Sequence, residues 1–523
     1  ACAANLYRAI LTRIIVQVKW QGKKFAVDVD TAAPGEVFKM QLFSLTGVAP
    51  DRQKVLVKGG QLKDDTDMST LGLKDGQVLM MMGTAGELPK APVQQVKFVE
   101  DMSEAEMAQA LSIPAGLVNM GNTCYMNATL QCLKAVPALR DALDAYKGTL
   151  AQPNAQGNLV ASLKKLFQHL SESGEGVPPL VFLQFLRQAF PKFAEQDPQF
   201  GGYRQQDAEE CWTELVTTLD HVLKTPEEVG VVGKYMTGEM ETTWSTDEAP
   251  DEPSTVNHER FRKLDCHIDK AINYLSHGIF KGLEQTIEKN SETLGRNAQY
   301  KAISRITRLP EYLPITFNRF FWKASESVEA KIVKSVKFPL DFDASEFCTA
   351  ELQEKMRPAK QFLRAKEDKE ALERKLAKQA RLAATDESSG GSKEAPKDAE
   401  PTQTTDKEKE EAEAKPFDLD ATLKADIGSN PSGVYELVGV VTHIGRTANS
   451  GHYMGWVRKE KGVGGPDPSP AASGKNAPES QHWWYKFDDD EVSLVSDDDI
   501  LKLCGGGDWH TAYILLYRAK KLD

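Results

Sequence analysis

Alternating apolar and polar residues mark the first folded unit of the chain. The alternation runs from Ile14 to Val18, breaks at Trp20–Lys24, and resumes from Phe25 to Val29. A period of two is typical of a strand with one buried face, and a short break between two such strands is typical of a hairpin. This end of the chain is therefore predicted to fold as two paired strands.

Further elements are predicted as far as Gly83. A helical stretch follows Pro34, and its buried side is predicted to carry Val37, Leu42 and Leu45. Strands are predicted at Lys54–Val57 and Gln77–Met82, which gives the order strand, strand, helix, strand, short elements, strand. Residues 12–83 are therefore expected to form a small separate domain.

The rest of the chain divides into a linker and a second, larger domain. Residues 84–110 contain proline and charge with little periodicity, which indicates a linker, and the second domain is expected to cover 111–523. Within it, residues 351–415 form a predicted insertion, helical to residue 384 and disordered from Thr385, where apolar residues almost vanish. Residues 460–481 are rich in glycine and proline and are predicted to form a flexible loop.

Charge, apolar content and cysteine usage exclude several classes of protein. The net charge of −12 argues against a nucleic-acid binder, which usually presents a basic face. We find no apolar run long enough to span a membrane and no secretory signal pattern. The seven cysteines are scattered without a C-x-x-C pair, which disfavours a disulfide framework or a zinc site and is typical of a reducing intracellular compartment.

The segment Gly116–Leu133 carries the most informative cysteine, Cys124. Small and polar residues lead into it, and apolar residues follow it at helical spacing until Pro137, so Cys124 is predicted at the start of a helix. The partial positive charge of a helix N-terminus stabilises a thiolate, and the thiolate is the nucleophilic form of cysteine. Cys132 lies two turns further along and is interpreted as a small core residue.

A cysteine nucleophile requires a base, and His452 is the best candidate among nine histidines. It follows a polar, glycine-containing loop and begins a predicted strand, next to the apolar strand Val434–Val441. His443 competes with it but ends that buried strand, and we interpret both His443 and His510 as packing residues. Asp488 ends the alternating segment that begins at Trp483 and is the candidate acid that orients the base, although three adjacent acids also suit a surface turn.

These segments together resemble the ubiquitin-specific protease family of papain-like deubiquitinases. The match includes Gly116–Leu133, Gly445–Arg458 and Trp484–Asp488, with two secondary segments, Gly202–Ala208 and Leu309–Phe320. Residues 12–83 resemble ubiquitin itself, and Leu56 falls about where ubiquitin has its main hydrophobic contact residue. The resemblance implies an α+β fold: a ubiquitin-like β-grasp domain followed by a protease domain with fingers, palm and thumb.

The resemblance also implies residue roles. Cys124 matches the family's nucleophile, His452 its general base and acid, and Asp488 its orienting acid. Asn119 matches the residue whose amide stabilises the oxyanion, with a turn-forming asparagine as the alternative. Gln206 and Asp207 match a motif near the ubiquitin-binding cleft, where structure and function are equally plausible roles. No cofactor is implied.

The middle region departs from many members of this family. They carry two C-x-x-C pairs that form a zinc ribbon in the fingers, whereas residues 233–304 contain only Cys266. We therefore expect fingers without zinc and no metal site.

The expected partners are ubiquitin and ubiquitinated proteins. A ubiquitin-like domain, the missing zinc pairs and the length are most similar to members of the family that associate with the proteasome. This implies docking on the regulatory particle of the 26S proteasome, activation there, and a cytoplasmic and nuclear location. It also implies two loops that obstruct the cleft, matching roughly 322–334 and 446–450.

Three alternatives remain. The chain could be a catalytically silent scaffold that holds ubiquitin near the proteasome, a papain-like protease for other substrates, or a deubiquitinase with another docking partner. The complete Cys, His and Asp set argues against the first, and the ubiquitin-like domain argues against the second.

Overall fold

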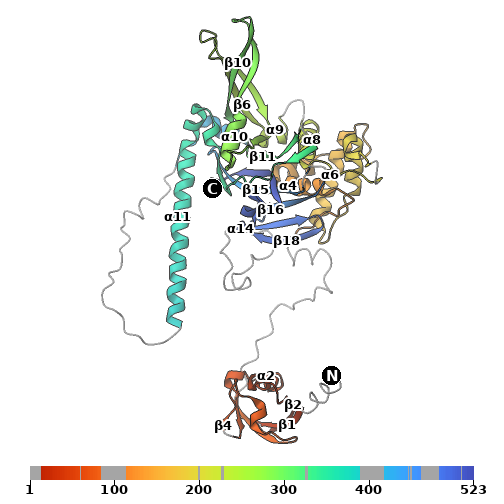
Figure 1. Cartoon of the computed structure of the whole chain (residues 1–523), viewed down its shortest axis with the longest axis vertical. Helices are drawn as coiled ribbons and strands as arrows, with labels where there is room; N and C mark the ends of the chain where they lie inside the picture. Colours follow the sequence, from red (N-terminus) through yellow and green to blue (C-terminus); the bar gives the residue numbers. More distant parts are fainter. Residues whose placement is uncertain are drawn as a thin grey trace, which may run out of the picture. The chain divides into compact units, whose positions relative to one another are not determined.

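The computed structural model divides the chain into two compact units, residues 1–98 and 99–523 (Figure 1). It describes residues 13–83 and 113–522, except residues 47, 59, 198–200, 225–228, 324–327, 389–416, 446, 448–449, 461–481 and 508. The predicted linker 84–110 and all of the predicted loop 460–481 except Glu460 lie outside the described residues. Among the described residues, every helix is too short or too polar to cross a bilayer.

The first unit is a five-stranded sheet with one helix packed on it. Its elements are β1 Arg13–Trp20, β2 Lys23–Asp30, α2 Gly35–Thr46, β3 Lys54–Val57, β4 Gly60–Gln61 and β5 Val78–Met82. The strand order is β2-β1-β5-β3-β4, with β1 parallel to β5 and the other neighbours antiparallel. This confirms the predicted order of elements and the β-grasp fold.

The buried side of α2 differs from the prediction. Phe38 and Leu42 are buried, whereas Val37 and Leu45 are 44% and 46% exposed. Positions four apart lie on the same helix face, so Phe38 and Leu42 form the stripe against the sheet. Lys39 is also buried, because its ammonium forms an ion pair with Asp64 at 2.7 Å.

The second unit contains a helical half that covers one face of a mixed sheet (Figure 1). Its helices are α4 Cys124–Lys134, α5 Pro137–Ala145, α6 Ala155–Glu172, α7 Leu180–Ala189, α8 Ala208–Leu223 and α9 Val231–Tyr235. Apolar residues of α4, α6 and α8 share one buried cluster with Val438, Val441 and Tyr453 of the sheet. The helix that begins at Cys124 is therefore fixed by core packing along its length.

The large sheet has the path β18-β17-β16-β15-β19-β11-β8, with β14 paired to β15. Its strands are β8 Leu264–His267, β11 Tyr312–Asn318, β14 Asp341–Asp343, β15 Val434–Ile444, β16 His452–Arg458, β17 Trp483–Asp488, β18 Glu491–Ser496 and β19 Thr511–Ala519. The short helix α14 Asp497–Leu501 follows β18. The predicted central strand is confirmed, because β15 lies between β16 and β19 and is almost wholly buried.

A second sheet projects from this body and corresponds to the fingers (Figure 1). Its path is β7-β6-β10-β9, with β6 Gly238–Ser245, β7 Thr255–Phe261, β9 Glu284–Ser291 and β10 Arg296–Arg308. Helix α10 Leu275–Leu283 precedes β9, and a hairpin of β12 Phe320–Lys323 and β13 Val328–Lys331 follows β11. Cys266 lies in β8 and is fully buried.

The predicted helical insertion is a single long helix, α11 Ala350–Ser388. Its many charged residues predict a solvated arm, but its first turns pack on the core, since Leu352, Met356, Ala359 and Leu363 are buried. The helix also continues four residues past the predicted boundary at residue 384, and residues 389–416 lie outside the described part. A short helix, α13 Ala421–Ala425, leads back towards β15.

The burial pattern of α2 can be tested with a matched pair of leucines. Leu42→Ala should destabilise the first unit by roughly 2–5 kcal/mol because it leaves a cavity in the core, whereas Leu45→Ala should cost less than about 0.5 kcal/mol. Hydrogen exchange of peptides from residues 13–83, measured in the full chain, reports the opening free energy of this unit. Equal protection losses in the two variants would contradict the assignment.

Candidate active site

Cys124 is the first residue of α4, as predicted, and is 2% exposed. The chain enters the helix through Gly121 and Asn122, whose φ angles are +92° and +53°. An asparagine in the left-handed region is uncommon, and such backbone concentrates at functional sites. The Asn122 side-chain amide donates to the carbonyl of Tyr203 at 2.9 Å, which holds this bend next to the segment before α8.

His452 is the first residue of β16, and the glycine before it is required by the backbone. Gly451 has a φ angle of +108°, and a Cβ atom there would lie 1.9 Å from the carbonyl oxygen of Ile444. Only glycine fits so close to a neighbouring strand in that conformation. The glycine-containing loop in the sequence therefore delivers the imidazole at a fixed strand position, where Ile444 of β15 pairs with His452.

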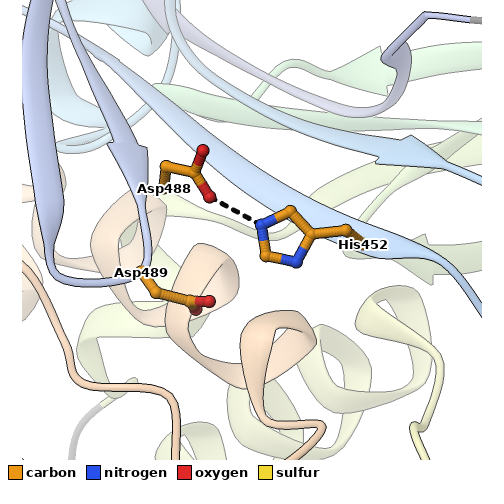
Figure 2. A group of neighbouring side chains, drawn as sticks. All are labelled: His452, Asp488 and Asp489. Carbon is orange, nitrogen blue, oxygen red and sulfur yellow. Dashed lines mark hydrogen bonds and ion pairs between the residues drawn. The ribbon is translucent and has the colours of Figure 1, made fainter.

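The structure brings the imidazole between a thiol and a carboxylate. His452 Nε2 lies 2.6 Å from Asp488 Oδ1, and Figure 2 shows the ring directed at that oxygen. The Cys124 side chain is also close enough to His452 to raise the pKa of the imidazole. Donation of the Nε2 proton to Asp488 leaves Nδ1 to exchange a proton with the thiol, which is the tautomer a base needs.

These contacts favour the charged form of the imidazole. The interaction with the Cys124 side chain, followed by the hydrogen bond with Asp488, raises the pKa of His452 to about 9 against the opposing effect of burial. The ring therefore carries its proton at neutral pH and can serve as the acid of a thiolate–imidazolium pair.

The pKa of each of the two competing histidines is lowered, in contrast to that of His452. Burial and the nearby Lys331 lower the pKa of His443 to about 3, and burial and His452 lower that of His510 to about 4. His443 Nε2 lies 3.0 Å from the Ser450 carbonyl and His510 Nδ1 lies 3.1 Å from the Thr442 hydroxyl. Both rings are buried and neutral, in agreement with the interpretation that they serve packing.

Asn119 combines the two alternatives considered for it. Its Oδ1 accepts the backbone N–H groups of Gly121 and Thr123 at 3.0 and 3.2 Å, which is a turn-forming role. Its Nδ2 donates to Asp489 Oδ2 at 2.8 Å. An amide nitrogen has two protons, so one N–H remains available for a developing oxyanion.

Asp489 is a site residue that the sequence analysis did not select. Its carboxylate accepts from the amides of Asn119 and Asn127, each at 2.8 Å, and its carbonyl accepts the N–H of Leu117 at 2.9 Å. Burial raises its pKa despite these bonds, and its φ angle is +55°. In a run of three acids no sequence signal distinguishes it, because its partners lie more than 360 residues away.

Asp207 has a structural role that the sequence left undecided. Its carboxylate caps α8 by accepting the N–H of Glu209 at 2.7 Å and accepts the hydroxyl of Tyr513 at 2.8 Å. Burial raises the pKa of Asp207 to about 6. Gln206 is also buried.

Metal ligation is a weak alternative for this cluster. In the described part of the chain, the ligand atoms of His452, Asp488 and Asp489 lie within 4.8 Å of one another. The His452 nitrogen is already bonded to Asp488, and both Asp489 oxygens accept amide protons. These groups therefore satisfy one another without a cation.

The comparisons with known proteins agree with this geometry. The family model described as "Ubiquitin carboxyl-terminal hydrolase" matches residues 115–517, which is most of the chain. The chain belongs to this family. Residues 14–86 match the model described as "Ubiquitin family". Members of the hydrolase family are cysteine-type deubiquitinases, so the predicted fold, enzyme class and family are confirmed.

Three relatives align with almost the whole of this hydrolase. "Ubiquitin carboxyl-terminal hydrolase 6" of Schizosaccharomyces pombe is 41% identical, over 97% of this chain and 99% of its own. "Ubiquitin carboxyl-terminal hydrolase 7" of Arabidopsis thaliana is 40% identical, over 98% of this chain and 100% of its own. "Ubiquitin carboxyl-terminal hydrolase 14" of Caenorhabditis elegans is 36% identical, over 97% of this chain and 93% of its own. Both units of the hydrolase are therefore covered by each alignment.

The hydrogen bond to Asp488 predicts a pH effect. Asp488→Asn removes one cause of the raised His452 pKa, so the upper limb of the pH–rate profile should move from about 9 towards 6.5. The profile is measured on ubiquitin with a fluorogenic C-terminal amide. Asp490→Asn, at an exposed neighbouring acid, is the control and should leave the limb in place. An unmoved limb in the Asp488 variant would exclude this role.

Proposed function

We propose that this hydrolase cleaves the bond after the C-terminal glycine of ubiquitin with Cys124 as the nucleophile. The thiol–imidazole–carboxylate arrangement of Cys124, His452 and Asp488 carries this proposal. In the resting thiolate–imidazolium pair, His452 already holds the proton transferred from the thiol. The thiolate then attacks the glycine carbonyl, and a tetrahedral intermediate with a negative oxygen forms. Asp488 holds the ring in the tautomer that this transfer requires.

Collapse of the intermediate breaks the bond to the leaving group. His452 gives its proton to the departing lysine amine, and the ubiquitin glycine remains as a thioester on Cys124. Water then attacks the thioester, with His452 as the base, and regenerates the thiol. The free N–H of the Asn119 amide and the first N–H groups of α4 would stabilise the oxyanion in both steps.

Access to the thiol is restricted in the free chain, because Cys124 is 2% exposed. Lys331 of β13 donates to the carbonyl of His443 at 2.6 Å, and the Ser450 carbonyl lies 3.0 Å from His443 Nε2. Lys331 and Ser450 belong to the segments 322–334 and 446–450, of which residues 324–327, 446 and 448–449 lie outside the described residues. If these segments obstruct the cleft as expected, the obstruction must be relieved before the ubiquitin tail can enter. We place activation at this step, with docking as its trigger.

The docking partner we propose is the regulatory particle of the 26S proteasome, in the cytoplasm and nucleus. The outer sheet face of the ubiquitin-like domain supports a protein partner, because five large apolar side chains are exposed there: Ile15, Leu56, Val78, Met80 and Met82. Leu56 and Met80 are neighbours across paired strands. Exposed apolar patches of this kind mark interaction sites.

Labelling with ubiquitin that carries a C-terminal electrophile tests the nucleophile and the trigger together. We expect slow formation of an adduct on Cys124 by the free chain and faster formation when purified proteasomes are added. Cys124→Ala should abolish labelling and hydrolysis while ubiquitin still binds, whereas Cys132→Ala, at a buried core thiol whose pKa is raised to about 12, should still be labelled.

Each other outcome has a definite meaning. Fast labelling of the free chain would contradict obstruction by the loops but keep the enzyme. No labelling in either condition would favour a silent ubiquitin-binding scaffold. Residual turnover by Cys124→Ala would overturn the assignment of the nucleophile.

The docking surface has its own test, with a control of equal exposure. Leu56→Asp should weaken binding to purified proteasomes at least about tenfold, because a central apolar contact is replaced by a charge. Val37→Asp, on α2, changes a side chain that is 44% exposed against 43% for Leu56 and should bind as the wild type does. Equal loss in both variants would indicate general damage to the domain.

A further inference from the structure

A cavity of about 490 Å³ opens at the end of α4 that is remote from Cys124. Lys134, the last residue of α4, lines it together with residues of α5, β15, β16, β17 and β19. Ten residues of helix separate Lys134 from Cys124, which corresponds to about 15 Å. The cavity is therefore a separate site, and its lining includes none of the four residues proposed for catalysis.

The lining of this cavity is strongly basic, although the whole chain carries a net charge of −12. Two carboxylates, Glu436 and Glu460, face six cations: Lys134, Arg140, Arg458, Lys459, Arg518 and Lys521. The excess of four positive charges is concentrated on one concave surface. A cleft lined by one sign of charge raises the local concentration of counter-ions.

Two of the arginines pair with the two carboxylates. Glu436 accepts from Arg458 at 2.8 Å and from Arg518 at 2.7 Å, and Arg518 also donates to Glu460 at 2.9 Å. Glu436, Arg458 and Arg518 are each only 15% exposed in their side chains. In this network both carboxylates already pair with arginine, and Glu436 with its two arginines forms a largely buried floor.

Three cations around this floor make no hydrogen bond or ion pair in the described part of the chain, although the charge of Lys521 acts on the carboxyl of Glu311. These three are Lys134, Arg140 and Lys521. Burial and the neighbouring Arg140 lower the pKa of Lys134 to about 8, which means that the charged ammonium is destabilised at this position. An anion in contact with the ammonium would stabilise its charged form.

We infer that this cavity binds a small anion that carries two or more phosphate groups. Ammonium and guanidinium groups are the side chains that bind phosphate, and three unpaired cations exceed the need of one phosphate group. The volume lies in the range of small-molecule sites. Tyr485 and Phe487 contribute an aromatic wall that a nucleotide base could contact.

The inference is tested by calorimetric titration of the full chain with inorganic tripolyphosphate and, separately, with ATP. Saturable binding is expected, weaker in high salt. Arg140→Gln with Lys521→Gln should reduce the affinity about a hundredfold, since each lost charged contact costs roughly tenfold. Both side chains are exposed, so the fold should be retained, as checked by the melting temperature.

A double variant elsewhere controls for the loss of two charges. Lys23→Gln with Lys24→Gln changes two exposed lysines of the ubiquitin-like domain and should bind tripolyphosphate as the wild type does. ATP that binds more tightly than tripolyphosphate identifies a nucleotide, and equal affinity identifies the phosphate chain alone. No saturable binding, or undiminished binding by the Arg140 and Lys521 variant, overturns the inference.

Discussion

The buried carboxylate of Asp489 is the contact on which the active-site geometry depends. It accepts hydrogen bonds from the amides of Asn119 and Asn127, 370 and 362 residues away, and so holds both the segment before α4 and the first turn of α4 against the end of β17. Burying a carboxylate is costly unless its oxygens are bonded, and here one amide satisfies each oxygen. The close approach also requires Gly116, where a Cβ atom would lie 2.5 Å from the Asp489 carbonyl oxygen. Thus the neighbour of the proposed orienting acid assembles the frame, while Asp488 itself remains free to contact the imidazole.

Three histidines within one region show how environment, and not residue type, decides chemistry. His443 and His510 are surrounded by protein and by like charge, which lowers the pKa of each ring. His452 lies at a strand end with its side chain 31% exposed, between a thiol and a carboxylate, and its pKa is raised. Opposite charge outweighs partial burial at His452, whereas burial prevails at the other two. This difference in pKa leaves one protonated imidazole next to two neutral ones. Of the three rings, only the one beside the thiol holds a proton.

Local features of the site could be predicted from sequence, and non-local ones could not. A helix that starts at Cys124 and a strand that starts at His452 follow from periodicity and from the glycines beside them. Asp488 was selected from its place at a strand end and from the resemblance, and it does contact His452. The contact of Asp489 with two asparagines depends on tertiary register that periodicity does not contain. The error at Val37 and Leu45 has a local cause. Apolar residues occur on all sides of α2, so only packing against the sheet decides that Phe38 and Leu42 form the buried stripe. The basic cavity could not be predicted from local pattern either, because its cations come from four separate segments.

Helix α4 joins two regions of different electrostatic character. Its N-terminus favours negative charge at Cys124, and its C-terminus carries Lys134 at the edge of a cavity with an excess of four cations. At about 15 Å and an effective dielectric constant of about 20, each unit charge acts on the thiol end with roughly 1 kcal/mol before screening by salt. The cations therefore add weakly to the stabilisation of a thiolate, and an anion in the cavity would subtract from it. Because α4 is packed along its length against β16, this influence would act through space along a rigid helix and would not require the helix to move.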